Sequence, residues 1–259
     1  MSSLKQSSLL IDIGNTHTHV GWHDGLNWLK FSEFSTGDLY DGKFNKLQSS
    51  YPSEAAPQWA AFCSVVPKAS EAIRAFLSEQ QLELGFTELS HKNPFNLGIE
   101  YPNPQTIGPD RIANAMAAAH YFGAPSVVVD FGTAVTFDVV SEKRKYVGGI
   151  IAPGVSVMAD YLHEKTALLP RIKIEEPSGV IGKNTQQAMQ IGAVHGYRGL
   201  VRELIGELTD TLNAKNLPVV ATGGYAKLIA GKLKSITAIR PNLTLEGLLL
   251  MAPELPRNP

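Results

Sequence analysis

The feature that most constrains the fold of this chain is a strand-and-turn pattern that occurs twice. Residues 8–16 read SLLIDIGNT and residues 127–134 read VVVDFGTA. In each segment an apolar run, typical of a buried strand, ends in Asp-x-Gly and leads into a Thr-containing turn and an alternating strand. The two aspartates, Asp12 and Asp130, are separated by close to half of the chain. The repeat therefore predicts two lobes of similar topology.

The rest of the pattern agrees with this division, because short apolar strands alternate with helical segments, which predicts an α/β fold. We expect strands at 8–13, 17–23, 27–34, 59–66, 126–130, 134–140, 145–151, 219–221 and 236–239. We expect helices that begin at Pro67 and Pro109, and further helices at 155–165, 184–212, 225–233 and 244–251. No linker rich in Pro, Gly or Ser occurs near residues 115–125, so we expect a helix to join an N-terminal lobe (1–118) to a C-terminal lobe (119–259).

The composition excludes several classes of protein. Lys and Arg number 23 against 24 Asp and Glu, which leaves no basic stripe for a nucleic acid or a membrane surface. The single cysteine, Cys63, excludes an internal disulfide and a cysteine-rich zinc site and is typical of a reducing compartment. No apolar run reaches the ~18 residues of a membrane-spanning helix, and the polar N-terminus lacks a signal-peptide core. We therefore expect a soluble, cytoplasmic protein.

The Asp-x-Gly turns are suited to phosphate binding. Glycine lets the backbone approach a bulky anion, successive amides and a threonine hydroxyl can hold phosphate oxygens, and a strand-end aspartate can hold Mg²⁺ through water. One such turn alone is more simply a hairpin whose aspartate bonds its own turn, but two copies favour a nucleotide site. A third turn, Thr222-Gly223-Gly224, suits either a nucleotide near a helix N-terminus or ordinary turn chemistry. The chain has no P-loop sequence, and Asp130-Phe131-Gly132 lacks the accompanying H-R-D loop of protein kinases.

Three histidines form a separate candidate cluster. His17, His19 and His23 would share one face of a strand, which makes a zinc site geometrically feasible. No cysteine accompanies them, so we expect solvated or turn-packing histidines instead. His17 can also lie near bound phosphates, because it follows Thr16.

Seven short motifs, taken in order, resemble the type III pantothenate kinase family of the actin/Hsp70/sugar-kinase superfamily. They are Asp12-Ile13-Gly14-Asn15-Thr16, Gly108-Pro109-Asp110-Arg111, Asp130-Phe131-Gly132-Thr133-Ala134, Leu168-Leu169-Pro170, Gly182-Lys183-Asn184-Thr185, Thr222-Gly223-Gly224 and Leu243-Thr244-Leu245-Glu246-Gly247-Leu248. The Asp-x-Gly turns are shared by the whole superfamily. The Gly-x-Asp-Arg segment at 108–111 and the run at 166–170 make the resemblance narrow.

The resemblance implies ATP-dependent phosphorylation of pantothenate, the first step of coenzyme A synthesis, on two ribonuclease-H-like lobes with a central nucleotide cleft. It also implies Mg²⁺ or another divalent cation, a monovalent cation such as K⁺ or NH₄⁺, and a homodimer. By position in the motifs, ATP would contact Asp12, Ile13, Gly14, Asn15, Thr16, His17, Thr18, His19 and Thr133. Pantothenate would contact Tyr101, Gly108, Pro109, Asp110, Arg111 and Thr185. Asp110 would be the catalytic carboxylate, and Asp130 would hold the monovalent cation.

The residue types suit these roles, although each has a purely structural alternative. A carboxylate such as Asp110 can orient a hydroxyl and accept its proton, or it can be a helix-start charge favoured by the helix dipole. Arg111 can pair bidentately with a carboxylate or phosphate, or form an ion pair with Asp110. Asp130 could merely bond backbone amides, Thr185 could be a helix cap or an exposed helix residue, and Tyr101 could anchor a proline-rich loop.

Two other functions compete with a pantothenate kinase. A non-enzymatic nucleotide-binding regulator could use the same fold, but the joint presence of Asp12, Asp110, Arg111 and Asp130 argues against it. Another enzyme of the superfamily, such as a sugar or acetate kinase or a polyphosphate hydrolase, would share the Asp-x-Gly turns. The segment 108–111 and the short chain separate the sequence from these enzymes.

Overall fold

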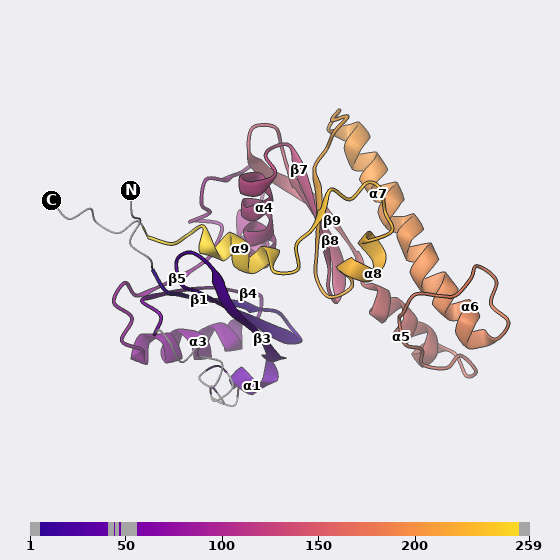
Figure 1. Ribbon diagram of the computed structural model, residues 1–259, viewed down its shortest axis with the longest axis horizontal. Helices are drawn as coiled ribbons and strands as arrows, with labels where there is room; N and C mark the ends of the chain where they lie inside the picture. Colours follow the sequence, from indigo (N-terminus) through magenta and orange to yellow (C-terminus); the bar gives the residue numbers. More distant parts are fainter. Residues whose placement is uncertain (1–5, 41–43, 45–46, 48–55, 254–259) are drawn as a thin grey trace. The chain divides into compact units, whose positions relative to one another are not determined.

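The chain divides into two compact units in a computed structural model that describes residues 6–40, 44, 47 and 56–253 (Figure 1). The first unit consists of residues 1–117 and 243–259, and the second of residues 118–242. The division falls inside helix α4 (Pro109–Tyr121). The lobes expected from the sequence, 1–118 and 119–259, differ from these units at residue 118 and at residues 243–259, which group with the first unit and not with the second.

The first unit is built on a mixed sheet in the order β3-β2-β1-β4-β5. Strand β1 runs antiparallel to β2 and parallel to β4. The strands are β1 (Ser8–Ile13), β2 (His17–His23), β3 (Trp28–Ser35), β4 (Trp59–Ser64) and β5 (Phe86–Glu88). The helices are α1 (Gly37–Tyr40), α3 (Pro67–Glu79), the greater part of α4 and α9 (Leu243–Leu249), with a short strand β6 (Gly98–Ile99) and a 3₁₀ helix (Pro104–Thr106) before α4.

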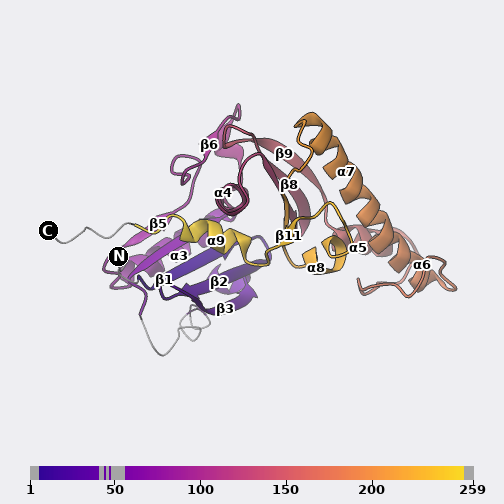
Figure 2. The same cartoon turned by 45° about the horizontal axis from the view of Figure 1, so that its top comes forward.

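The alternation of side chains gives β1 two different faces. Leu9, Ile11 and Ile13 are fully buried in a core that they share with α3. Helix α9 contacts β1 and β4, and Figures 1 and 2 show it on the side of the sheet opposite α3. Because successive side chains of a strand point to opposite faces, Asp12 lies on the α9 side and not in the α3 core.

Helix α9 is held against α4 by close contacts. The Thr244 hydroxyl donates to Asn114 Oδ1 at 2.9 Å, and both side chains are buried. Gly247 lies on the backbone of Ala113, where a Cβ would overlap the Ala113 carbonyl oxygen. These contacts explain why the segment 243–248 groups with the first unit although it lies near the end of the chain.

Five strands of the second unit repeat this arrangement, in the order β11-β10-β7-β8-β9. Strand β7 runs antiparallel to β8 and parallel to β10. The strands are β7 (Ser126–Phe131), β8 (Ala134–Val140), β9 (Lys145–Pro153), β10 (Val219–Thr222) and β11 (Ala238–Ile239). The helices are α5 (Val155–Lys165), α6 (Thr185–Ile191), α7 (Tyr197–Thr211) and α8 (Ala226–Ala230). The core joins Val127 and Val129 of β7 to Val201 and Ile205 of α7.

The helix predicted over 184–212 is not one α-helix. A π-helical segment, Gly192–Gly196, separates α6 from α7. Glycine stabilises an α-helix less than other residues do, and two glycines bound this segment, so the wider turn is tolerated there. Within the described residues, no helix has the length and the hydropathy that crossing a membrane requires.

Candidate functional site

The first group of candidate site residues, in the first unit, is the turn between β1 and β2 at residues 14–16. The Gly14 amide donates to the His17 carbonyl at 3.0 Å, and a Cβ on Gly14 would lie 3.1 Å from the same oxygen. Asn15 and Thr16 are exposed at the tip. The backbone is thus accessible at the tip of the turn, as a phosphate-binding turn requires.

The residues predicted to line ATP at 12–19 do not all face the same way. The side chains of Ile13 and Thr18 are fully buried, so only their backbone can reach a ligand. The side chains of His17 and His19 are exposed, and Asp12 is half-buried.

Asp12 contacts a buried cysteine on the neighbouring strand. Cys63 is opposite Asp12 in the parallel pairing of β1 with β4, and its thiol donates to Asp12 Oδ1 at 3.3 Å. Burial raises the pKa of the Cys63 thiol well above its usual range, and the charges of Asp12 and Asp110 raise it further. The thiol therefore stays protonated and serves as a neutral donor to Asp12.

Asp110 lies in the first turn of α4 and has a buried oxygen that lacks a partner. Among the described residues, its Oδ1 atom accepts no hydrogen bond although it is inaccessible to solvent. Burial raises the pKa of the Asp110 carboxyl, while a backbone hydrogen bond from Arg111 and the charge of Arg111 partly offset this rise. A buried acceptor without a donor is costly and calls for a ligand group that donates to it.

The segment before Asp110 leaves no room for a larger residue. The Arg111 amide donates to the Gly108 carbonyl at 3.0 Å, and a Cβ on Gly108 would overlap Asp110 Oδ1. Gly108 and Pro109 therefore set the position of the carboxylate through the backbone, and Arg111 is half-buried beside it.

The candidate site residues of the second unit begin with the turn between β7 and β8. The Gly132 amide donates to the Ala134 carbonyl at 3.1 Å, and Thr133 is exposed at the tip. The Gly154 amide, just after β9, donates to the Thr133 carbonyl at 3.0 Å. A Cβ on Gly154 would overlap that carbonyl oxygen, so the close approach requires glycine.

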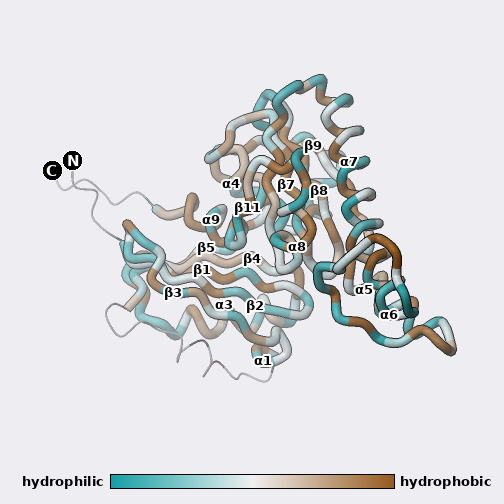
Figure 3. Tube along the Cα trace, turned by 45° about the vertical axis from the view of Figure 1, so that its right-hand side comes forward, coloured by the Kyte–Doolittle hydropathy of each residue, from teal (hydrophilic) through white to brown (hydrophobic). Residues whose placement is uncertain are grey.

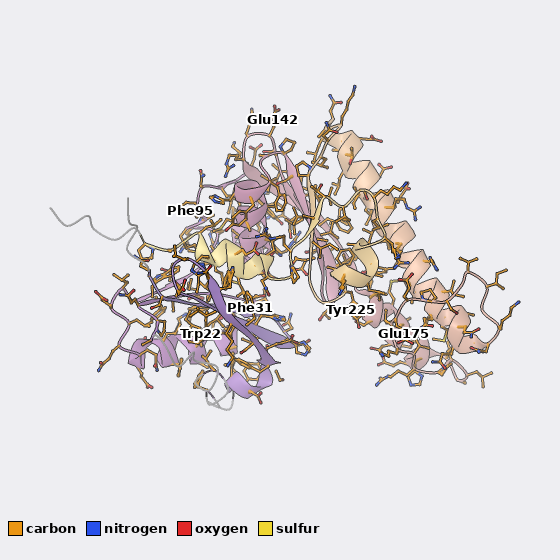
Figure 4. The ribbon with its side chains drawn as sticks, viewed as in Figure 1. Trp22, Phe31, Phe95, Glu142, Glu175 and Tyr225 are labelled. Carbon is orange, nitrogen blue, oxygen red and sulfur yellow. The ribbon has the colours of Figure 1, made fainter. Side chains whose placement is uncertain are left out.

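Asp130 is covered by the glycine turn that follows β10. Gly223 has a φ of +89°, and a Cβ there would lie 2.5 Å from Asp130 Oδ1 and 2.7 Å from the Phe131 backbone. Tyr225 directly precedes α8 and is labelled in Figure 4, and its amide donates to the Phe131 carbonyl at 3.3 Å. The turn that sequence reasoning assigned either to a nucleotide or to simple turn chemistry thus packs directly on the Asp130 strand end.

Two predicted substrate contacts lie on exposed segments. Thr185 is the first residue of α6, and the cap of that helix is Asn184, whose Oδ1 accepts the Gln187 amide at 2.9 Å. Thr185 is thus an exposed helix residue. Tyr101 is exposed just before the 3₁₀ helix of the first unit.

The histidines of β2 form weak surface contacts. His17 Nε2 lies 3.7 Å from Glu33 Oε1, and His19 Nδ1 lies 3.8 Å from Glu33 Oε2. Burial lowers the pKa of His19 although Glu33 acts in the opposite direction. His23 Nδ1 accepts the Gly25 amide at 3.0 Å. Within the part of the chain that the structure describes, no three His, Cys, Asp or Glu side chains are grouped to hold a metal ion.

Sequence reasoning missed three residues that support these turns: Thr36, Cys63 and Gly154. Thr36 lies directly after β3, and its hydroxyl donates to the Gly14 carbonyl at 2.7 Å. A correct pairing of β1 with β4 would have placed Cys63 beside Asp12. Nothing in the local sequence separates Thr36 or Gly154 from ordinary turn residues.

Comparisons of the sequence with known proteins identify a family and its members. The family model for type III pantothenate kinase matches residues 8–207. A type III pantothenate kinase of Methylacidiphilum infernorum (isolate V4) is 40% identical over 244 residues, which cover 94% of this chain and 87% of the relative.

Two solved structures share the fold at low sequence identity. A conserved putative Baf family transcriptional activator from Campylobacter jejuni has a TM-score of 0.59 at 21% identity and covers 93% of this chain and 95% of its own. A putative 2-dehydro-3-deoxygalactonokinase from Sinorhizobium meliloti has a TM-score of 0.57 at 12% identity and covers 94% of both chains. The predicted fold class, the duplicated α/β fold of actin-like ATPases and sugar kinases, is thereby confirmed. The match to the family model and to a relative over nearly the whole chain shows that this protein belongs to the type III pantothenate kinase family.

Proposed function

We propose that the chain phosphorylates pantothenate with ATP, as its family does, and that Asp110 is the carboxylate that receives the pantothenate hydroxyl. The observation that carries this assignment is the buried Asp110 Oδ1, which accepts no hydrogen bond from the described residues. A primary hydroxyl supplies the missing donor. Once bound there, the hydroxyl oxygen is oriented for attack on the γ-phosphorus of ATP.

The surroundings of Asp110 suit this role. Burial raises the pKa of the carboxyl, which makes it a stronger proton acceptor than an exposed aspartate. In a loose phosphoryl-transfer transition state the hydroxyl loses its proton late, so holding it in line matters more than removing its proton early. Arg111 is half-buried beside Asp110 and offers a bidentate partner for the carboxylate of pantothenate. Gly108, Pro109, Tyr101 and Thr185 complete the proposed pantothenate contacts.

The two Asp-x-Gly turns are the proposed contacts of ATP. In the first unit these are residues 12–19, with side chains from Asp12, Asn15, Thr16, His17 and His19 and with backbone from Ile13, Gly14 and Thr18. In the second unit Thr133 is exposed at the tip of its turn.

The cations that the family implies have different candidate ligands. Asp12, half-buried at the end of β1, would hold Mg²⁺ through water, because this ion usually keeps several waters and few protein ligands when it binds with a nucleotide. The Mg²⁺ ion would neutralise charge on the transferring phosphoryl group. Asp130 is the proposed ligand of K⁺ or NH₄⁺, because the close approach of Gly223 keeps its carboxylate beside the backbone of the second turn.

We also propose a cytoplasmic homodimer. Helix α5 and the segment that follows it carry exposed apolar side chains, and Figure 3 colours apolar residues brown along the chain. These side chains are Val157, Met158, Tyr161, Leu162 and Leu168. A second copy of the chain would remove this surface from water.

The first test is a coupled assay of ATP consumption with pantothenate, with sugars and acetate as control substrates, in K⁺, NH₄⁺ and Na⁺. Of the acceptors tested, we expect only pantothenate to give ATP turnover, and we expect K⁺ or NH₄⁺ to stimulate that turnover. Turnover with a sugar or with acetate in its place would favour another kinase of the superfamily, and nucleotide binding without any turnover would favour a regulator.

The decisive variant is Asp110→Asn. We expect kcat to fall by about 10²–10⁴-fold, while thermal unfolding shows equal or higher stability. The stability follows from the raised pKa of Asp110. Above the pKa of this carboxyl in the unfolded chain, ionisation costs more in the folded state than in the unfolded state and so lowers the free energy of unfolding. Asparagine carries no charge and removes this cost. A variant with near-normal kcat would show that Asp110 is only structural.

A further inference from the structure

Thr36 lies beneath the turn at residues 14–16 and contacts it twice. It follows the last residue of β3, and its side chain is fully buried. Its amide donates to the Thr16 carbonyl at 3.0 Å, and its hydroxyl donates to the Gly14 carbonyl at 2.7 Å. The residue that follows β3 thus holds two carbonyls of the turn, those of Gly14 and Thr16.

A second buried hydroxyl supports the first. Thr18 Oγ1 lies 3.0 Å from Thr36 Oγ1, and Thr18 is also fully buried. A hydroxyl has one hydrogen to donate, and that of Thr36 is directed to Gly14. Thr18 must therefore be the donor in the pair, so the hydrogen bonds run from Thr18 to Thr36 and from Thr36 to the Gly14 carbonyl.

The direction of the Gly14 carbonyl determines the direction of the Asn15 N–H, which belongs to the same peptide group. In a trans peptide the C=O of one residue and the N–H of the next lie in one plane and point in opposite directions. Because the Gly14 oxygen is held toward the buried Thr36 hydroxyl, the Asn15 N–H points the other way, toward the exposed tip of the turn. An outward amide at this place is a donor for an anion.

We propose that Thr36 is a positioning residue for ATP: its hydroxyl fixes the Gly14–Asn15 peptide so that the Asn15 N–H faces the nucleotide phosphates. This inference rests on the proposed function, because it takes the turn at 14–16 as the phosphate-binding turn. A hydroxyl at residue 36 is required, whereas the methyl group of threonine only fills space. Serine therefore retains the function, and valine does not.

The test compares Thr36→Val with Thr36→Ser in the full-length enzyme. Valine keeps the volume and removes the hydroxyl, which leaves the Gly14 oxygen and the Thr18 hydroxyl unpaired. We expect the Kd for Mg·ATP to rise about tenfold in Thr36→Val and to stay within about twofold of wild type in Thr36→Ser. The KM for pantothenate should change little in either variant. Binding of Mg·ATP is measured by calorimetry without pantothenate, so that the result does not depend on turnover.

Two further variants complete the design. Thr18→Val removes the supporting donor but leaves the Thr36–Gly14 bond, so we expect a smaller rise in Kd than in Thr36→Val. Thr209→Val removes a hydroxyl that donates to the Ile205 carbonyl at 2.7 Å within α7, far along the chain, and should leave Kd unchanged. If Thr36→Val does not fold, the double variant Thr18→Val/Thr36→Val, which leaves no hydroxyl unpaired, replaces it.

The outcomes are distinguishable. A Thr36→Val enzyme that is less stable yet binds Mg·ATP like wild type would overturn the inference and make Thr36 a structural residue only. Equal losses in the Ser and Val variants would also overturn it. Wild-type protein that binds Mg·ATP but does not consume it with pantothenate would refute the proposed function, while the binding measurements would still decide the role of Thr36.

Discussion

The two units share their strand topology but differ in what surrounds the aspartate. In both, the aspartate is the fifth residue of a six-residue strand that runs antiparallel to the next strand and parallel to a later one. In both, the residue just after the third strand donates its amide to the last carbonyl of the turn, from Thr36 to Thr16 and from Gly154 to Thr133.

The differences lie in the side chains. The first unit places a threonine hydroxyl under its turn, a thiol beside Asp12 and the carboxylate of Asp110 nearby. The second unit has Gly154 at the position of Thr36 and Thr222 at that of Cys63, and Gly154 and Gly223 bring backbone against the turn and against Asp130. The duplicated topology thus produces two turns of similar shape, one supported by buried polar side chains and the other by close backbone packing.

This contrast predicts that the two aspartates respond to different cations. We expect Asp12→Asn to lower turnover about 10²-fold and to raise the Mg²⁺ concentration needed for half-maximal rate, because a ligand of the ion that neutralises the phosphoryl charge is lost. We expect Asp130→Asn to reduce the stimulation by K⁺ and to leave the Mg²⁺ requirement near that of wild type. The measurement is turnover against each cation with the other held constant. If Asp12→Asn and Asp130→Asn changed the responses to Mg²⁺ and to K⁺ in the same way, the prediction that the two turns bind different cations would be wrong.

The repeat and the strand bounds were predictable because they depend on local pattern. Strands β1, β2 and β8 and helix α5 begin and end at the predicted residues, since apolar alternation and flanking glycines mark them locally. Family membership was predictable for the same reason, because its motifs are short and contiguous.

The contacts that complete the site depend on register and packing, which the local sequence does not contain. Cys63 contacts Asp12 only because β1 and β4 pair in one particular register. Thr36 contacts Gly14 across the β2–β3 hairpin, and the nearby serines, Ser32 and Ser35, look equally suitable in the sequence. The position of α9 beside α4 depends on Gly247 and on the Thr244–Asn114 hydrogen bond, which joins residues far apart in the chain.

The second prediction concerns the residue that directly follows the partner of each aspartate on the neighbouring parallel strand. Gly223 follows Thr222, the partner of Asp130, and the corresponding residue of the first unit is Ser64, the partner of Ile13. We expect Gly223→Ala to lower the free energy of unfolding by about 2–4 kcal/mol, because alanine is strained at a φ of +89° and its Cβ would press on the Phe131 backbone. Ser64→Ala should cost only about 1 kcal/mol, from the lost hydrogen bonds to the backbone of Val66. Urea unfolding measures the free energy of unfolding of both variants. Equal losses would show that the backbone packs no more tightly at Gly223 than at Ser64.

The smallest expected effect concerns the residue opposite each aspartate, Cys63 in the first unit and Thr222 in the second. Burial raises the pKa of the Cys63 thiol well above its usual range, so the folded state keeps this proton while the unfolded chain loses it above about pH 8.5. The unfolded state then binds fewer protons, and the free energy of unfolding falls as the pH rises through that range. We expect Cys63→Ser to retain the hydrogen bond to Asp12 and to remove this decline.

Cys63→Ala separates the two contributions of the thiol. It removes the same titration but also the donor to Asp12, so its stability should be lower than that of Cys63→Ser by about 1 kcal/mol at every pH. Thr222→Val is the matched change in the second unit and should leave the pH dependence of stability unchanged, because threonine does not titrate there. Stability measured between pH 7 and pH 10 therefore tests whether the thiol is held neutral beside the carboxylates. Rapid alkylation of Cys63 in the folded wild-type enzyme at pH 8 would contradict it, because only an accessible thiolate reacts quickly.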